Sequence, residues 1–202
     1  MGVYVRRSSG ESLSRMPFRP AYPVRTDRLL LRPLNEADLP ALLAYHSSPA
    51  VHQFLPMEPM DADGVLQRLR HGLWSRSTLE DQGESLFLGV ALLSTGELVG
   101  DVMLRWLSAR DQGGEIGYVL NPAHGGHGYA TEAARALLHL AFDQLDLHRV
   151  IARIDPRNTA SLRVAERLGM RREALLIANH WQRDRWADEV DFALLRHEWE
   201  GR

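Results

Sequence analysis

The stretch that decides the fold is EIGYVLNPAHGGHGYATEA, residues 115–133. Its first six residues predict a strand, a glycine-rich turn follows, and apolar residues recur at helical spacing from Ala130 to Phe142. A helix begins with backbone N–H groups that have no internal partner, at the positive end of its dipole. Glycines allow a pyrophosphate to approach such groups closely. The stretch therefore predicts a phosphate cradle.

Two common phosphate-binding loops do not fit this turn. A Walker A loop ends in Gly-Lys-Ser/Thr, and the turn has no lysine. A dinucleotide-binding fingerprint needs a third glycine and usually stands early in its domain, whereas three predicted strands precede this turn. A glycine turn alone is weak evidence for any one phosphate-containing ligand.

The flanking segments predict a layered α/β domain. Asn35 is expected to cap a helix, with Asp38 three residues further on, and Gly169 suits a helix C-terminus. Residues 48–63 contain several chain breaks and predict a loop with one short turn. The expected order is β-α-α-β-β-β-α-β-α-β-β, which places helices against a mixed sheet. The other predicted strands span 26–32, 85–93, 98–107, 149–155, 171–182 and 187–195, and a second early helix includes Val65, Leu66, Leu69 and Leu73.

Composition narrows the class of protein. A length of 202 residues suits one domain, and a net charge of −2 gives no support to nucleic-acid binding. The chain has no cysteine, which excludes disulfides, thiolate metal sites and a cysteine nucleophile. No apolar run approaches the roughly 20 residues that span a membrane. We expect a cytoplasmic protein with a flexible leader at residues 1–24 and a single domain at residues 25–202.

Several motifs together resemble one family. The turn Gly128-Tyr129-Ala130 fits the second half of the Gln/Arg-x-x-Gly-x-Gly/Ala signature of the GNAT superfamily, and Glu-Ile-Gly-Tyr stands before it. The resemblance covers residues 26–199 and is strongest to the RimJ/RimL-like branch, named for ribosomal-protein alanine and serine N-acetyltransferases. Gly125 departs from the usual Gln, Arg or Trp, which removes a side chain but no backbone donor. The further matching motifs are Asn158-x-x-Ser161, Glu166-x-Leu168-Gly169-Met170 and Trp186-x-Asp188.

The resemblance implies a fold and a coenzyme. The fold is the α/β GNAT acyl-CoA N-acyltransferase fold, with a mixed, mostly antiparallel sheet, a splayed central strand pair and helices on both faces. The co-substrate is acetyl-CoA, and no metal is expected, because His124 and His127 lack a third ligand nearby. The implied coenzyme-binding residues are Tyr118, Val119, Leu120, Gly125, Gly126, His127, Gly128, Tyr129, Ala130, Thr131, Asn158 and Ser161.

The chemistry of acetyl transfer requires three functions. An amine must lose a proton before it attacks the thioester, an N–H donor must hold the oxyanion, and the departing thiolate gains from a proton. By resemblance, Ser161 is the general acid, with a helix N3 residue bonded to backbone as the alternative. His180 occupies the position of the family's base, and an exposed hairpin residue is its alternative. Glu115 is the other candidate base, acting through a water, or else a cross-strand charge partner.

The acceptor is expected to enter between residues 51–64 and residues 179–187. Carboxylates in these segments favour an amine that arrives protonated, and Trp181 and Trp186 offer faces for a cation. An alternative place for these tryptophans is a homodimer interface. We expect a primary amine, with a protein or peptide N-terminal α-amine ahead of a polyamine or drug-like amine. The remaining alternative is a CoA-binding module without catalysis.

Overall fold

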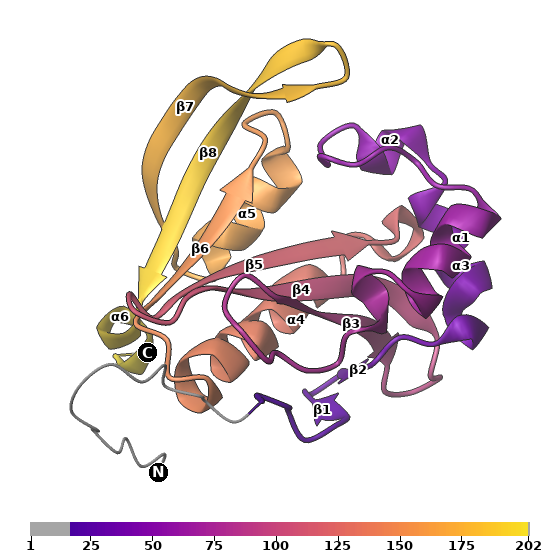
Figure 1. The fold of residues 1–202 in the computed structure, drawn as a ribbon, viewed down its shortest axis with the longest axis horizontal. Helices are drawn as coiled ribbons and strands as arrows, with labels where there is room; N and C mark the ends of the chain where they lie inside the picture. Colours follow the sequence, from indigo (N-terminus) through magenta and orange to yellow (C-terminus); the bar gives the residue numbers. More distant parts are fainter. Residues whose placement is uncertain (1–16, 202) are drawn as a thin grey trace.

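One eight-stranded sheet organises residues 17–201, the part of the chain that the computed structural model describes. The strand order is β1-β2-β3-β4-β5-β6-β8-β7 (Figure 1). Neighbouring strands are antiparallel except for β5 and β6, which are parallel. The strands are β1 (Val24–Arg25), β2 (Leu29–Arg32), β3 (Ser85–Leu92), β4 (Leu98–Ser108), β5 (Gly113–Leu120), β6 (Arg149–Ile154), β7 (Arg171–Gln182) and β8 (Arg185–Leu195).

Helices pack on both faces of this sheet, because its strands alternate their side chains between two apolar cores. On β3, Leu86 and Leu88 join the core that contains Leu137 of α4, whereas Phe87 packs against the core of α1 and α3. Each fully buried leucine contributes roughly 1.5–3 kcal/mol. The helices are α1 (Leu39–His46), α2 (Pro49–His52), α3 (Ala62–Arg70), α4 (Tyr129–His139), α5 (Thr159–Arg167) and α6 (Arg196–Glu200), with a π-helical turn at Leu140–Gln144.

The central strands β5 and β6 separate after a short pairing. Their register runs from Gly113↔Arg149 to Glu115↔Ile151, and β5 then continues to Leu120. Over the same length β6 keeps its antiparallel partner β8, as far as Ile154↔Val190. Within residues 17–201, the side of β5 that faces β6 therefore has no strand partner after Glu115. The expected mixed, mostly antiparallel sheet with a splayed central pair is confirmed.

Asn35 caps a helical segment as predicted, and this segment is the 3-10 turn Glu36–Asp38 that leads into α1. Asn35 and Asp38 form a reciprocal cap, in which the Asn35 side chain accepts from the Ala37 amide at 2.9 Å and Asp38 accepts from the Asn35 amide at 2.9 Å. Arg32 at the end of β2 donates to both oxygens of Asp38 at 2.7 and 2.8 Å. The cap therefore also ties the start of α1 to the sheet, on the side of the second core.

Two elements were not predicted. The two-residue strand β1 and the five-residue α6 are too short to show a periodic pattern. Helix α2 is four residues long and forms the one short turn expected within loop 48–63. Pro49 begins this helix, and a proline at the first helical position loses no hydrogen bond.

The segment before β1 contacts the domain from residue 18 onward. Phe18 and Leu79 exchange backbone hydrogen bonds at 2.8 and 2.9 Å, and the Tyr22 hydroxyl donates to the Ser77 carbonyl at 2.8 Å. Residues 1–16 of the predicted leader lie outside the described residues, so its boundary stays a prediction. Among the helices of residues 17–201, none combines the length and apolarity that a bilayer crossing needs.

Candidate active site

The glycine turn before α4 has the geometry of an anion cradle. Gly126 and Gly128 adopt φ of +81° and +79°, which favour glycine, and Gly128 is the N-cap of α4 without a side-chain cap. The first helical bond of α4 runs from the Glu132 amide to the Gly128 carbonyl at 3.1 Å. The amides of residues 129–131 therefore remain for a ligand at the positive end of the helix.

Two observations are compatible with the expected pyrophosphate at this turn. The Thr131 hydroxyl is buried without a hydrogen-bond partner in the first turn of α4, and an anion would supply the missing acceptor. A side chain at Gly126 would meet nothing within 4 Å, so the turn is open outward. Gly125 has φ of −65° and is conformationally ordinary, so its role comes from its backbone alone.

The two histidines of the turn have protein partners. His124 forms an ion pair with Glu97 at 3.2 Å when protonated, and the His127 ring stacks on Tyr129 with centroids 5.4 Å apart. No group of three His, Cys, Asp or Glu residues suited to a metal occurs within residues 17–201. These contacts give the histidines a structural role in shaping the turn.

The splayed end of β5 lies beside the start of α5. The Tyr118 hydroxyl donates to the Ser161 carbonyl at 3.0 Å, and burial raises the pKa of Tyr118, so it acts as a neutral donor. Asn158 is the N-cap of α5, and its side-chain oxygen accepts from the Ser161 amide at 3.1 Å. Ser161 thus sits at N3. The structure brings together Tyr118, Asn158 and Ser161, and the side-chain nitrogen of Asn158 is a donor that the cap does not use.

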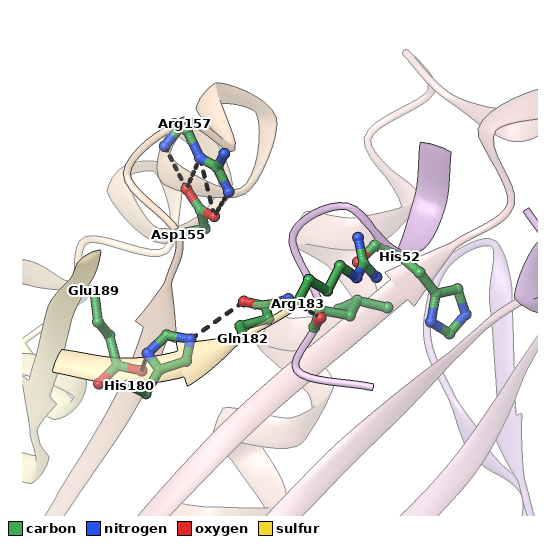
Figure 2. A network of polar contacts seen from close by, with 8 residues as sticks. His52, Asp155, Arg157, His180, Gln182, Arg183 and Glu189 are labelled. Atoms are coloured by element: carbon green, nitrogen blue, oxygen red, sulfur yellow. Dashed lines mark hydrogen bonds and ion pairs between the residues drawn. The ribbon is translucent and has the colours of Figure 1, made fainter. Parts of the chain in front are cut away.

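The two candidate bases belong to one polar chain on the opposite face of the sheet. Arg153 of β6 lies 3.7 Å from Glu115 and 3.9 Å from Glu189. The His180 Nδ1 lies 3.9 Å from the Glu189 carboxylate, while its Nε2 contacts Gln182 at 3.2 Å (Figure 2). One oxygen of Glu115 and the Nδ1 of His180 are buried without a hydrogen bond. Both groups therefore retain an unused site for a proton or a water.

Glu115 lies in a mixed electrostatic environment. Burial is the largest effect on its pKa and raises it. The nearby charges act in both directions, since Arg153 and Arg105 lower the pKa and Glu189 and Asp191 raise it, and the net pKa is raised. A raised pKa makes a carboxylate a stronger base toward water or an ammonium group. The cross-strand charge partner expected for Glu115 is present, since Arg153 lies 3.7 Å from its carboxylate, and the role of Glu115 as a base stays a prediction.

The tip of the β7–β8 hairpin docks on residues 52–58, a contact that sequence patterns did not reveal. Figure 2 shows Arg183 and Gln182 extending from the hairpin toward this segment. Arg183 donates to the carbonyls of His52 and Met57 and pairs with Glu58 at 3.3 Å, and Gln182 donates to the Leu55 carbonyl. The two segments expected to flank the acceptor are therefore joined to each other.

A buried network of hydrogen bonds connects residues 52–58 to α1 and β4. The Met57 carbonyl can only accept, so His52 Nδ1 donates to it at 3.0 Å. Burial lowers the pKa of His52, and its neutral Nε2 accepts from His46 Nδ1 at 3.2 Å. His46 Nε2 lies 2.7 Å from Asp101 Oδ1, and Asp101 also accepts from the Tyr45 hydroxyl at 2.7 Å. Asp101 lies opposite Val119 in the β4–β5 register, so the network reaches the splayed strand.

The chain belongs to the GNAT acetyltransferase family. The family described as Acetyltransferase (GNAT) domain matches residues 28–171. YnaD of Bacillus subtilis (strain 168), an uncharacterized N-acetyltransferase, is 32% identical over 176 residues, which are 87% of this chain and 98% of that protein. A GNAT-family acetyltransferase structure from Bacillus anthracis superposes with a TM-score of 0.77 at 31% identity, covering 87% of this chain and 99% of its own. The protein is an acetyl-CoA-dependent N-acetyltransferase.

Relatives whose names state an acceptor differ from one another in that acceptor. YdaF of Bacillus subtilis (strain 168), a putative ribosomal N-acetyltransferase, is 32% identical over 128 residues, 63% of this chain and 68% of that protein. Spermidine N(1)-acetyltransferase of Escherichia coli (strain K12) is 23% identical over 171 residues, 84% of this chain and 87% of that protein. The expected RimJ/RimL-like branch is therefore not confirmed, and family membership leaves the acceptor open.

Replacing Gly128 by valine should abolish coenzyme binding. A β-branched residue is strained at φ of +79°, so the turn would shift and its amides would lose their alignment. Calorimetry with CoA should give no binding heat. Gly83→Val is the matched control, because Gly83 has φ of +88° with nothing within 4 Å, and its turn bonds to Trp106, at the end of β4 opposite the one that pairs with Leu120. It should lose stability but keep binding CoA, and equal loss of binding in both variants would contradict the assignment.

Glu115→Gln should gain stability relative to the wild type as pH rises. The folded protein holds the Glu115 proton above the model-peptide pKa of 4.5, so the raised pKa stabilises the wild type at low pH and this contribution is lost as pH rises through the folded pKa. Urea unfolding between pH 4 and 8 measures the difference. Glu173→Gln is the control of opposite sign, since hydrogen bonds from Arg149 and Arg171 hold the pKa of Glu173 at about 2. A constant difference for Glu115→Gln would refute the burial argument.

Proposed function

We propose that the protein acetylates a primary amine by direct attack in a ternary complex, and that this amine is the N-terminal α-amine of a protein or peptide. The observation that carries the proposal is that β5–β6 pairing ends at Glu115 while β5 continues to Leu120, in the segment that leads to the glycine turn. Residues 118–120 thereby present backbone groups next to the cradle. An acyl-CoA held by the cradle would extend its pantetheine arm along these groups, with its thioester at the polar face of the sheet.

The proposed reaction uses residues on both faces of the sheet. The neutral amine attacks the thioester carbon, and backbone N–H groups of Tyr118–Leu120 hold the oxyanion. Collapse forms the amide and breaks the carbon–sulfur bond. The departing thiolate takes a proton or hydrogen bond from Ser161, which the Asn158 cap and the Tyr118 contact fix beside β5. The amine proton leaves to a base on the opposite face.

His180 is the base that we propose, with Glu115 as the alternative through a water. Its Nδ1 is buried without a hydrogen bond and lies 3.9 Å from the Glu189 carboxylate, so this nitrogen has no protein partner that would compete for the amine proton. Its position is fixed by the cross-strand pair with Ala187 and by Gln182, which is itself docked on Leu55. The hairpin tip thus holds the base in a defined orientation.

The charges around this site favour a cationic acceptor. Glu115, Glu189 and Asp191 gather around Arg153 on one face of the sheet, where Arg153 contacts the first two. Such a face attracts an amine in its protonated form. Trp181 and Trp186 stand at the hairpin with exposed fractions of 60% and 61%, and their rings offer an apolar flank for the residues that follow an N-terminus. An α-amine also supplies more neutral nucleophile at pH 7 than lysine or a polyamine.

Replacing His180 by alanine should lower kcat/KM by roughly 10²-fold at low pH, where removal of the amine proton limits the rate. At high pH the amine is already neutral, so the variant should approach the wild type. A pH–rate profile measures this. His197→Ala on α6 is the control, since this histidine is exposed and remote, and it should leave the profile unchanged. An unchanged profile for His180→Ala would move the assignment to Glu115.

The acceptor is tested with paired peptides. One peptide carries a free N-terminus, the second is the same peptide with a blocked N-terminus and one lysine, and spermidine is the third acceptor. We expect the highest kcat/KM for the free N-terminus. Preference for the blocked lysine peptide would contradict α-amine specificity. Preference for spermidine over both peptides would instead favour a polyamine acceptor, as in the relative named spermidine N(1)-acetyltransferase.

A further inference from the structure

Arg28, just before β2, contacts the first turn of α4 in several ways. Its Nε and Nη2 lie 2.7 and 2.6 Å from the Glu132 carboxylate, and its Nη1 donates to the His127 carbonyl at 3.0 Å. Its guanidinium also lies over the Tyr129 ring, 4.9 Å from the centroid. The Arg28 Nη2 is 3.6 Å from the position of a Cβ at Gly128. One side chain thus touches the cradle at three points.

Glu132 brings a negative charge to the place where the coenzyme needs a positive field. Burial raises its pKa, but hydrogen bonds from Thr26 and Arg28 outweigh burial and the net pKa is lowered. The Thr26 hydroxyl donates at 2.6 Å and the Arg28 amide at 2.9 Å. The carboxylate is therefore ionised at neutral pH, one turn from the cradle. A fixed carboxylate there repels a diphosphate unless another group cancels its charge.

An ordinary exposed ion pair does not account for these contacts. Such pairs contribute little to stability because solvent screens them and their side chains lose freedom. The Arg70–Glu36 pair has comparable geometry, with hydrogen bonds of 2.9 and 2.7 Å, and both of its side chains are about half exposed. Arg28 differs in that it also binds the His127 carbonyl and covers Tyr129, while the side chain of Glu132 is only 16% exposed.

We propose that Arg28 is a positioning residue for the coenzyme. By donating to the His127 carbonyl, it turns that oxygen away from the cradle and holds the turn so that the amides of residues 129–131 face the diphosphate. By pairing with Glu132, it cancels the charge that would oppose an anion. The residue acts through the turn and through Glu132, and the role holds whichever amine the enzyme acetylates.

Because Arg28 and Glu132 carry opposite charges, a set of single and double variants distinguishes the proposed role from a merely structural one. Arg28→Ala exposes the Glu132 charge and should raise the Kd for CoA about tenfold. The double variant Arg28→Ala/Glu132→Gln removes both charges and should recover most of the affinity. Glu132→Gln alone leaves Arg28 unopposed and should bind CoA at least as tightly as the wild type. Calorimetry with CoA gives each Kd, and steady-state kinetics should show a raised KM for acetyl-CoA with an unchanged KM for the acceptor.

Arg70→Ala is the matched control, because it removes a similar bidentate pair that joins other elements. It should leave the Kd for CoA within twofold of the wild type. The inference is overturned if Arg28→Ala stays within twofold, if the double variant binds as weakly as Arg28→Ala, or if Glu132→Gln weakens CoA binding. Should Arg28→Ala fail to fold, the result for Glu132→Gln decides alone, since that change keeps the side-chain shape.

Discussion

The parallel pairing of β5 with β6 stops at Glu115 and Ile151, and this leaves one side of β5 without a strand partner within residues 17–201. Backbone N–H and C=O groups that lack partners are costly when buried. In the proposed complex, a coenzyme arm that carries its own amides would satisfy them in the way that a neighbouring strand does. The interruption of the sheet is thus the feature on which the proposed ligand site depends, and the glycine turn follows the end of β5.

The separation of the two strands is held from both faces. On one face, the Tyr118 hydroxyl bonds β5 to the first turn of α5, and the apolar core that contains α4 packs against the same strand. On the other face, Asp101 stands opposite Val119 and connects β4 to α1 and α2 through His46 and His52. Removing one member of such a buried network leaves its partners unsatisfied, which is more costly than the bond itself is stabilising.

Local patterns were sufficient for much of the fold, but the contacts that complete the site depend on residues distant in the chain. The Asn35 cap, the helix after Gly128 and the strand at residues 171–182 follow from spacing and turn chemistry within a few residues. Arg28 and Glu132 are 104 residues apart, and Gln182 and Leu55 are 127 apart. No periodicity or motif encodes such pairs. The coenzyme turn was therefore predictable in place and shape, whereas its charge partner and the hairpin contact required the tertiary structure.

The hairpin contact has a consequence for how this enzyme can change. Arg183 and Gln182 bind mainly to main-chain carbonyls of residues 52–58, and every amino acid presents the same carbonyl. Most side chains of that segment are thereby free to vary without undocking the hairpin or displacing His180. On the proposed acceptor path, mutation of this segment would change the surface next to the incoming amine and leave the proposed base in place. A library randomised at residues 53–56 would then change the choice of acceptor separately from the chemistry.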